Sequence, residues 1–206
     1  MKDPAAPNSS LRLIRLLLWG IVVLAIASAA AIFLLRTPAT PPSSAVATST
    51  IGGPFTLVGA DGKPFSSAKL AGEPYAIYFG FTRCGDICPT TLARLVKLRK
   101  QAGGEHKFNI VFVTIDPAND GPKEVGQYAG LFNSPIIGLT GSQAQIDHVK
   151  KQYGIFAEPS PHPMAGKEME HSAMVLLFDR NGKFASTIAR DDADLAALAK
   201  LKQVVR

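Results

Sequence analysis

Cysteine is scarce in this sequence, because only two of its 206 residues are cysteines, Cys84 and Cys88. Both lie in the segment FGFTRCGDICPTTLARL, residues 79–95. A closed structural zinc site usually takes four protein ligands, so the lack of further cysteines argues against one. A disulfide across so short a loop would restrain little chain entropy, which leaves a purely structural disulfide as the weaker alternative. The two thiols therefore indicate redox or metal chemistry.

The sequence also lacks a strong excess of one charge. Residues 1–36 hold four basic residues and one acidic residue, and residues 37–206 hold 18 basic and 15 acidic residues. Each part thus contributes half of the formal net charge of +6. Because no basic stripe interleaved with aromatic residues is present, we exclude nucleic acid as a partner.

Charge is absent altogether from residues 16–35, LLLWGIVVLAIASAAAIFLL. A helix needs about 20 apolar residues to cross a bilayer, so this segment is a predicted single-pass transmembrane anchor. Arg12 and Arg15 precede it, which predicts a cytoplasmic N-terminus, residues 1–15, and a folded part on the periplasmic, extracytoplasmic side. A cleaved signal peptide, with its cleavage site near Ala27–Ala29, is the alternative and would export the same part.

Residues 36–50 are rich in Pro, Ser, Thr and Ala and have the composition of a flexible tether. Residues 51–206 are the predicted folded domain. In it, uncharged strands at 75–81 and 108–116 alternate with helical patterns, one of which opens on the capping-box pattern of Ser142 and Gln145. A hairpin and a final helix follow. This order predicts an α/β domain with a central mixed sheet flanked by helices, for which the thioredoxin-like fold is the natural candidate. The cysteines would lie where the strand at 75–81 meets a helix beginning at Thr90.

The spacing of Cys84 and Cys88 puts both sulfurs about one helical turn apart, so that a metal fits between them. Two thiolates form a soft site that favours Cu(I), and Cu(II) stays open as a second state. Of the four histidines, His171 is the expected third ligand, because it closes a long loop directly before a predicted strand. In that loop Met164 and Met169 are either auxiliary thioether ligands or ordinary loop residues.

Other functions use the same dithiol differently. A thiol–disulfide oxidoreductase would need Cys84 and Cys88 as a redox pair but would not need His171. A peroxidase of the peroxiredoxin type fits less well, because that family carries Thr three residues before its reactive Cys and position 81 here is Phe. A copper-sensing or protein-binding module is a further alternative.

The motifs GFTRCGDICPTTL, VTIDPAND, GLTG and EHSAMVLLFDRNGKF together resemble the SCO/SenC family of copper proteins. The resemblance extends over nearly the whole of residues 51–206. It implies a thioredoxin-like fold and copper bound by Cys84, Cys88 and His171. It also implies a metallochaperone that delivers copper to the CuA centre of cytochrome c oxidase subunit II. The alternative is a reductase that acts on the acceptor's cysteines and is itself recharged by a thiol reductant.

The roles of several residues near the cysteines stay open. Arg83 stands where many family members have His or an aromatic residue, and its charge beside Cys84 should favour the thiolate. For Asp116 and Asp120 the resemblance implies partner recognition or tuning of the site, whereas a turn and a helix cap are the plain alternatives. Asp86 is expected to orient the loop between the cysteines through hydrogen bonds from its side chain to the backbone.

Overall fold

The computed structural model describes residues 9–35, 51–160 and 169–206. Within these ranges, the side chains of residues 9–13, 29–35, Pro159, Glu170 and His171 lie outside the description. The chain divides into two units, Met1–Ser49 and Thr50–Arg206, each of which is described by itself.

The first unit contains one described helix, α1 (Ser9–Leu35). Large apolar side chains along it, such as Leu16 and Trp19, are exposed. Within the described residues, which in α1 include the side chains of residues 14–28, no helix is both long and apolar enough to cross a membrane. The predicted anchor over residues 16–35 is therefore not confirmed.

A seven-stranded mixed sheet forms the centre of the second unit, in the order β2-β1-β5-β4-β3-β8-β9. The central strands β3, β4 and β5 run parallel, and β1 and β8 run antiparallel to their neighbours β5 and β3. Strands β3 and β4 pack on both faces, which explains why their sequences lack charge. The bounds of the strands are Thr56–Gly59 (β1), Pro64–Ser66 (β2), Tyr75–Gly80 (β3), Asn109–Thr114 (β4), Ile137–Thr140 (β5), Val175–Phe178 (β8) and Phe184–Ile188 (β9).

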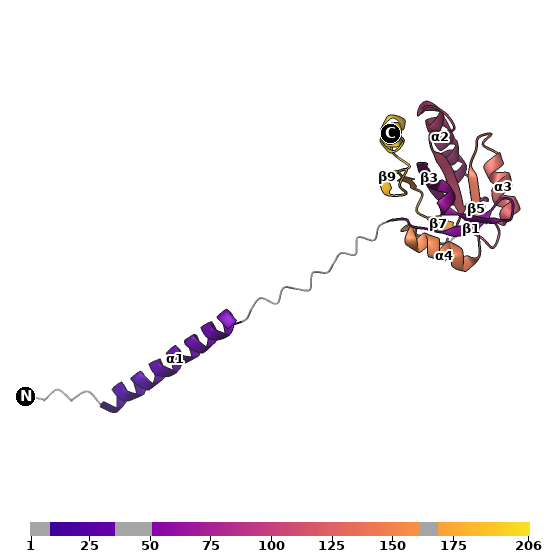
Figure 1. Cartoon of the computed structure of the whole chain (residues 1–206). Coiled ribbons are helices and arrows are strands. Elements are labelled where there is room, and N and C mark those ends of the chain that lie inside the picture. The colour runs from indigo at the N-terminus through magenta and orange to yellow at the C-terminus, as the bar shows by residue number, and fades with distance from the viewer. Residues whose placement is uncertain (1–8, 36–50, 161–168) are drawn as a thin grey trace, which may run out of the picture. The chain divides into compact units, whose positions relative to one another are not determined.

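Helices cover both faces of this sheet. Tyr78, Gly80 and Phe112 face α2 and α3, as contacts of Gly80 with Cys88 and of Phe112 with Tyr128 indicate. Helix α5 packs beside α2, and in Figure 1 α2 runs along β3. On the opposite face, Tyr153 at the end of α4 packs against Phe79. The helices are α2 (Ile87–Gln101), α3 (Pro122–Gly130), α4 (Gln143–Gln152), α5 (Asp194–Val204) and a short 3-10 helix, η1 (Ser67–Leu70).

The predicted α/β architecture, a central mixed sheet flanked by helices, is confirmed. The capping box of Ser142 and Gln145 also forms as predicted and begins α4. Two details differ. Helix α2 begins at Ile87, three residues before the predicted Thr90, so Cys88 lies inside the helix. The predicted loop 157–171 contains a second, two-stranded sheet made of β6 (Ala157–Pro159) and β7 (Met169–His171).

Candidate functional site

The two cysteines lie at the junction of β3 and α2. Cys84 follows the strand and donates its backbone N–H to Phe81 O at 3.2 Å, and Cys88 occupies the first turn of α2. Cys84 is 7% exposed and Cys88 is fully buried. Pro89 does not disturb this turn, because the N–H that it lacks has no intrahelical partner in the first turn of a helix. The junction therefore presents Cys84 toward the surface and keeps Cys88 beneath it.

The environments of the two sulfurs are unequal. Both residues are thiols, and the backbone N–H of Cys88 donates to Cys84 Sγ at 3.3 Å. A hydrogen bond to Cys84, and then burial, raise the pKa of the Cys88 thiol well above its usual value. Because backbone N–H donors at a helix start favour negative charge, Cys84 is the sulfur better supported as a thiolate. The pair thus combines a supported nucleophile with a buried thiol that keeps its proton.

Cys88 Sγ packs directly against the backbone of β3 at Gly80. A Cβ atom added at Gly80 would lie 2.8 Å from this sulfur and 3.2 Å from the ring of Phe112. Real Cβ contacts do not come so close, so any larger residue at position 80 would displace the sulfur. The site therefore depends on glycine at position 80, because the Cys88 sulfur occupies the space that a side chain there would fill.

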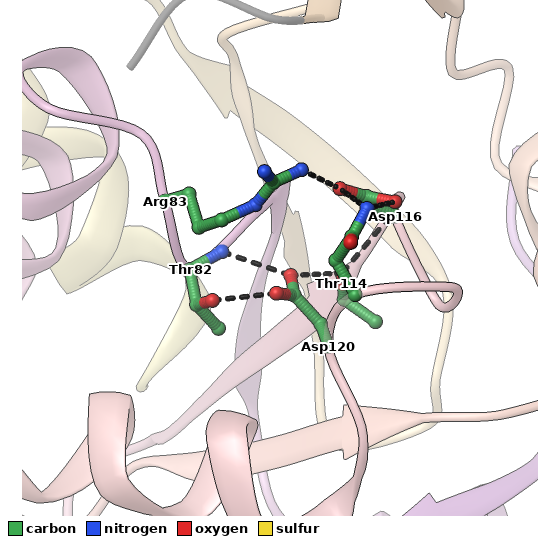
Figure 2. A network of polar contacts seen from close by, with 6 residues as sticks. Thr82, Arg83, Thr114, Asp116 and Asp120 are labelled. Carbon is green, nitrogen blue, oxygen red and sulfur yellow. Dashed lines mark hydrogen bonds and ion pairs between the residues drawn. The ribbon is translucent and has the colours of Figure 1, made fainter. Parts of the chain in front are cut away.

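Asp120 ties the loop before Cys84 to the neighbouring strands (Figure 2). Its carboxylate is buried and accepts hydrogen bonds from the Thr82 N–H at 2.9 Å, the Thr82 hydroxyl at 2.5 Å and the Thr114 hydroxyl at 2.6 Å. Its backbone carbonyl accepts a bond from the Thr140 hydroxyl at 2.6 Å. Thr114 and Thr140 end β4 and β5, so one residue connects the carboxyl ends of the parallel strands to the cysteine loop.

Asp116 restrains the same loop from its exposed side. It pairs with Arg83 at 2.8 Å, and the amide of Asn119 donates to both of its carboxylate oxygens at 3.0 Å. Figure 2 shows the guanidinium of Arg83 directed at Asp116. The expected cation beside Cys84 is thus largely neutralised by this carboxylate. Both aspartates contact the cysteine loop, which favours tuning of the site. The turn expected at Asp116 also forms, because the N–H groups of Asn119 and Asp120 donate to the Asp116 carbonyl at 3.1 and 3.0 Å.

The helix-cap alternative for Asp120 and the expected role of the Asp86 side chain are both wrong. Asp120 does not cap α3, because the N-cap is Gly121 and makes no side-chain cap hydrogen bond. Asp86 occupies the N-cap position of α2 but likewise makes no side-chain cap hydrogen bond. Its carbonyl instead accepts bonds from the N–H and the hydroxyl of Thr90, at 3.2 and 2.8 Å. Asp86 is therefore an exposed residue whose backbone, rather than its carboxylate, stabilises the helix start.

The backbone of His171 ends β7, in register with Ala157, while its side chain lies outside the described residues. Strand β8 begins four residues later and runs antiparallel to β3, with Val175 beside Tyr78. The start of β8 therefore lies at the same sheet edge as the end of β3. Among the residues that the structure describes, no cluster of three or more His, Cys, Asp or Glu could hold a metal ion. The described part of the site is the dithiol.

The structure describes only one of the two methionines predicted as possible ligands in the 157–171 region. Met164 lies outside the described residues, whereas Met169 is partly buried and packs against the core. Sequence reasoning missed Thr82, Thr114, Tyr78 and Gly80 as parts of the site. For Gly80, the only signal was a glycine inside an apolar strand, which often marks a close approach by another group.

Comparison with known proteins agrees with this geometry. The family model described as SCO1/SenC matches residues 43–206. A SCO2-like protein of Rickettsia conorii is 38% identical over 162 residues, which cover 73% of this chain and 77% of the relative. The structure of Bradyrhizobium japonicum ScoI with copper bound is 34% identical, has a TM-score of 0.66 and covers 75% of this chain and 99% of its own. These matches confirm the predicted thioredoxin-like fold.

A second similar structure is that of BsSco, which is described as a member of the Sco family of cytochrome c oxidase assembly proteins and in which a disulfide switch was identified. It is 26% identical, has a TM-score of 0.58 and covers 74% of this chain and 92% of its own.

Replacing Asp120 by Asn should destabilise the domain by about 1–3 kcal/mol, because an amide cannot accept all the hydrogen bonds that the carboxylate accepts. Asp116→Asn is the matched control and should cost less than about 1 kcal/mol, since its partner Arg83 is 48% exposed. Urea unfolding of the two variants gives the comparison. Equal losses would contradict the view that Asp120 is the main restraint on the loop.

Proposed function

The chain belongs to the SCO1/SenC family, and from this premise we propose that it is a copper metallochaperone. It binds Cu(I) through Cys84, Cys88 and His171 and passes it to the CuA centre of cytochrome c oxidase subunit II or to another copper acceptor. The observation that carries the proposal is the pair of closely spaced thiols at the start of α2. Support comes from ScoI of Bradyrhizobium japonicum, whose structure holds copper, and from BsSco, which belongs to a family of cytochrome c oxidase assembly proteins.

The described residues fit a soft monovalent ion. Thiolates are the ligands that Cu(I) prefers, and this site offers two of them on one short segment. Cys84 is the more exposed of the two cysteines and its sulfur accepts the Cys88 N–H, so it is suited to be the first ligand that incoming copper meets. Cys88 then binds from below and gives up its proton, which couples copper loading to the reduced state of both sulfurs.

His171 supplies the third ligand in this proposal. The antiparallel register of β3 and β8 supports it, because that register carries the chain just after His171 to the edge where β3 ends. Ala173 and Val175 also line one pocket together with Asp86 and Ile87, which stand between the cysteines. A site with three ligands leaves one side open, so thiols of an acceptor can replace the protein ligands one at a time.

The second candidate function is thiol–disulfide exchange with the acceptor. The unequal environments of the sulfurs favour it, because Cys84 can attack an acceptor disulfide while Cys88 keeps its proton. A mixed disulfide forms between Cys84 and the acceptor, and one acceptor sulfur leaves as a thiolate. Cys88 then attacks Cys84, which releases the acceptor as a dithiol and leaves a Cys84–Cys88 disulfide. A thiol reductant must return the pair to the reduced form.

We also propose that residues 16–35 anchor the chain in a membrane, with residues 1–15 in the cytoplasm and the folded domain, joined by the tether 36–50, on the periplasmic side. The support is the uncharged run of 20 residues. A tether would hold the domain near a membrane-bound acceptor and raise its effective concentration there.

Copper binding is tested by titrating Cu(I) into the reduced protein against a competing chelator. We expect one Cu(I) per chain and an affinity that falls more than about tenfold in His171→Ala, or ~1.4 kcal/mol, because one of three ligands is lost. His148→Ala is the matched control, since His148 is exposed on α4, and it should bind like the wild type. Equal affinity of wild type and His171→Ala would remove His171 from the site.

Disulfide exchange is tested with a model peptide disulfide. Cys84→Ser should abolish formation of the mixed disulfide, because the attacking sulfur is gone, whereas Cys88→Ser should trap it. His171→Ala should reduce the peptide at nearly the wild-type rate. A large loss of rate in His171→Ala would count against the reductase as an activity separate from metal binding.

Membrane anchoring is tested by fractionating cells after an alkaline wash. The full-length chain should stay with the membranes, and Leu24→Arg should release it, since a central arginine costs about 2.5–3.5 kcal/mol of insertion free energy. Leu24→Ile should behave like the wild type. Release of the wild-type chain, or a mature chain that starts near residue 30, would reject the anchor.

A further inference from the structure

Tyr78 brings a hydroxyl group to the sulfur of Cys88. It lies in the middle of β3, is fully buried and donates its hydroxyl proton to Cys88 Sγ at 3.5 Å. A distance of this size is a hydrogen bond to sulfur, which has a larger radius than oxygen. The contact joins the central strand to the first turn of α2 at the sulfur that is less accessible to solvent.

Gly80 makes this contact possible. The Tyr78 ring and the Cys88 sulfur both approach the position of a Cβ at Gly80, with the ring carbon Cε1 at 3.1 Å and the sulfur at 2.8 Å. Tyr78 and Gly80 are two residues apart on one strand and therefore face the same side of the sheet. The ring and the sulfur thus share the space above the glycine, and their direction of approach is set by packing.

The donor role of Tyr78 follows from its protonation. A tyrosine hydroxyl keeps its proton at neutral pH, so Tyr78 is the donor in the bond to Cys88 Sγ. The side chain of Thr91 also hydrogen-bonds to this hydroxyl. Thr91 lies three residues after Cys88 on α2, which puts both side chains on the same face of the helix. The hydroxyl oxygen of Tyr78 is therefore held against α2 by Cys88 and Thr91.

We propose that Tyr78, whose hydroxyl is held by Thr91, is a positioning residue for Cys88. Its hydrogen bond stabilises the reduced form of Cys88 and so sets the balance between copper binding and disulfide exchange. A thiol or thiolate sulfur accepts a hydrogen bond better than a disulfide sulfur does, because it carries more negative charge. The bond from Tyr78 is thus stronger in the reduced protein than in the oxidised protein. Hydrogen bonds to cysteine sulfur are a recognised means of tuning sites of this kind.

This inference rests on the proposed function, since only the reduced pair takes up copper. A more stable dithiol keeps a larger share of the chains ready for copper at a given redox potential. A less stable dithiol shifts the same chains toward the disulfide, which cannot bind Cu(I). Tyr78 contacts the second sulfur and leaves Cys84, the sulfur nearer the surface, to meet the partner.

The test is the exchange equilibrium of the full-length chain with glutathione redox buffers, read as the fraction of Cys84–Cys88 disulfide. In Tyr78→Phe the equilibrium constant for disulfide formation should rise about three- to tenfold, because a stabilising bond to the reduced state is lost. Thr91→Val should shift it in the same direction by less. If Tyr78→Phe does not fold, as judged by circular dichroism, Thr91→Val alone carries the test.

Tyr128→Phe is the matched control. Tyr128 is also buried, its ring contacts Phe112 on the same face of the sheet, and its hydroxyl has no hydrogen-bond partner among the described residues. Tyr128→Phe should leave the exchange equilibrium with glutathione unchanged. Wild-type behaviour in Tyr78→Phe and Thr91→Val, with normal Cu(I) binding by the wild type, would overturn the inference and leave the proposed function intact. A wild-type chain that neither binds Cu(I) nor exchanges with glutathione would overturn both.

Discussion

The rest of the site depends on one buried carboxylate, that of Asp120. Burying a charge is costly unless its hydrogen bonds are replaced, and here two hydroxyl groups and one backbone N–H replace them. Because Thr82 belongs to the loop after β3 and Thr114 ends β4, satisfying this carboxylate fixes where the loop lies. Cys84 follows two residues after Thr82. With the loop in that place, the Cys88 N–H donates a hydrogen bond to the Cys84 sulfur at 3.3 Å.

The second constraint comes from packing at the opposite side of the cysteine pair. Cys88 lies between helix α2 and strand β3. Its sulfur packs against Gly80, in the space that a larger side chain would fill, and contacts the hydroxyl of Tyr78. Polar bonding thus fixes Cys84 and close packing fixes Cys88. The two cysteines differ in exposure and in their hydrogen bonds for this reason, although they belong to one short segment. A carrier that must both hold and release a metal ion can use this difference.

The sequence predicts those strands and helix starts that depend on residues close to one another in the chain. An uncharged run predicted β3, and the capping box of Ser142 predicted the start of α4, because both signals are local. The start of α2 was placed at Thr90, a residue type common at helix starts, but the helix already begins at Ile87, because Pro89 is tolerated in a first turn. The role of Asp120 stayed open between the site and a helix cap, because its partner Thr82 is 38 residues away in the sequence. Bonds between such distant residues depend on strand order and side-chain direction, which no local pattern encodes.

The space above Gly80 has a consequence for protein engineering. A redesign that aims to change the metal preference of this pair cannot begin at position 80, where even one methyl group would collide with the Cys88 sulfur. Position 78 is different, because there the ring can be kept while its polar atom is changed. The packing around the second sulfur is therefore adjustable in chemistry but not in volume. A directed library would gain most by varying polarity at positions 78 and 91 and leaving the glycine untouched.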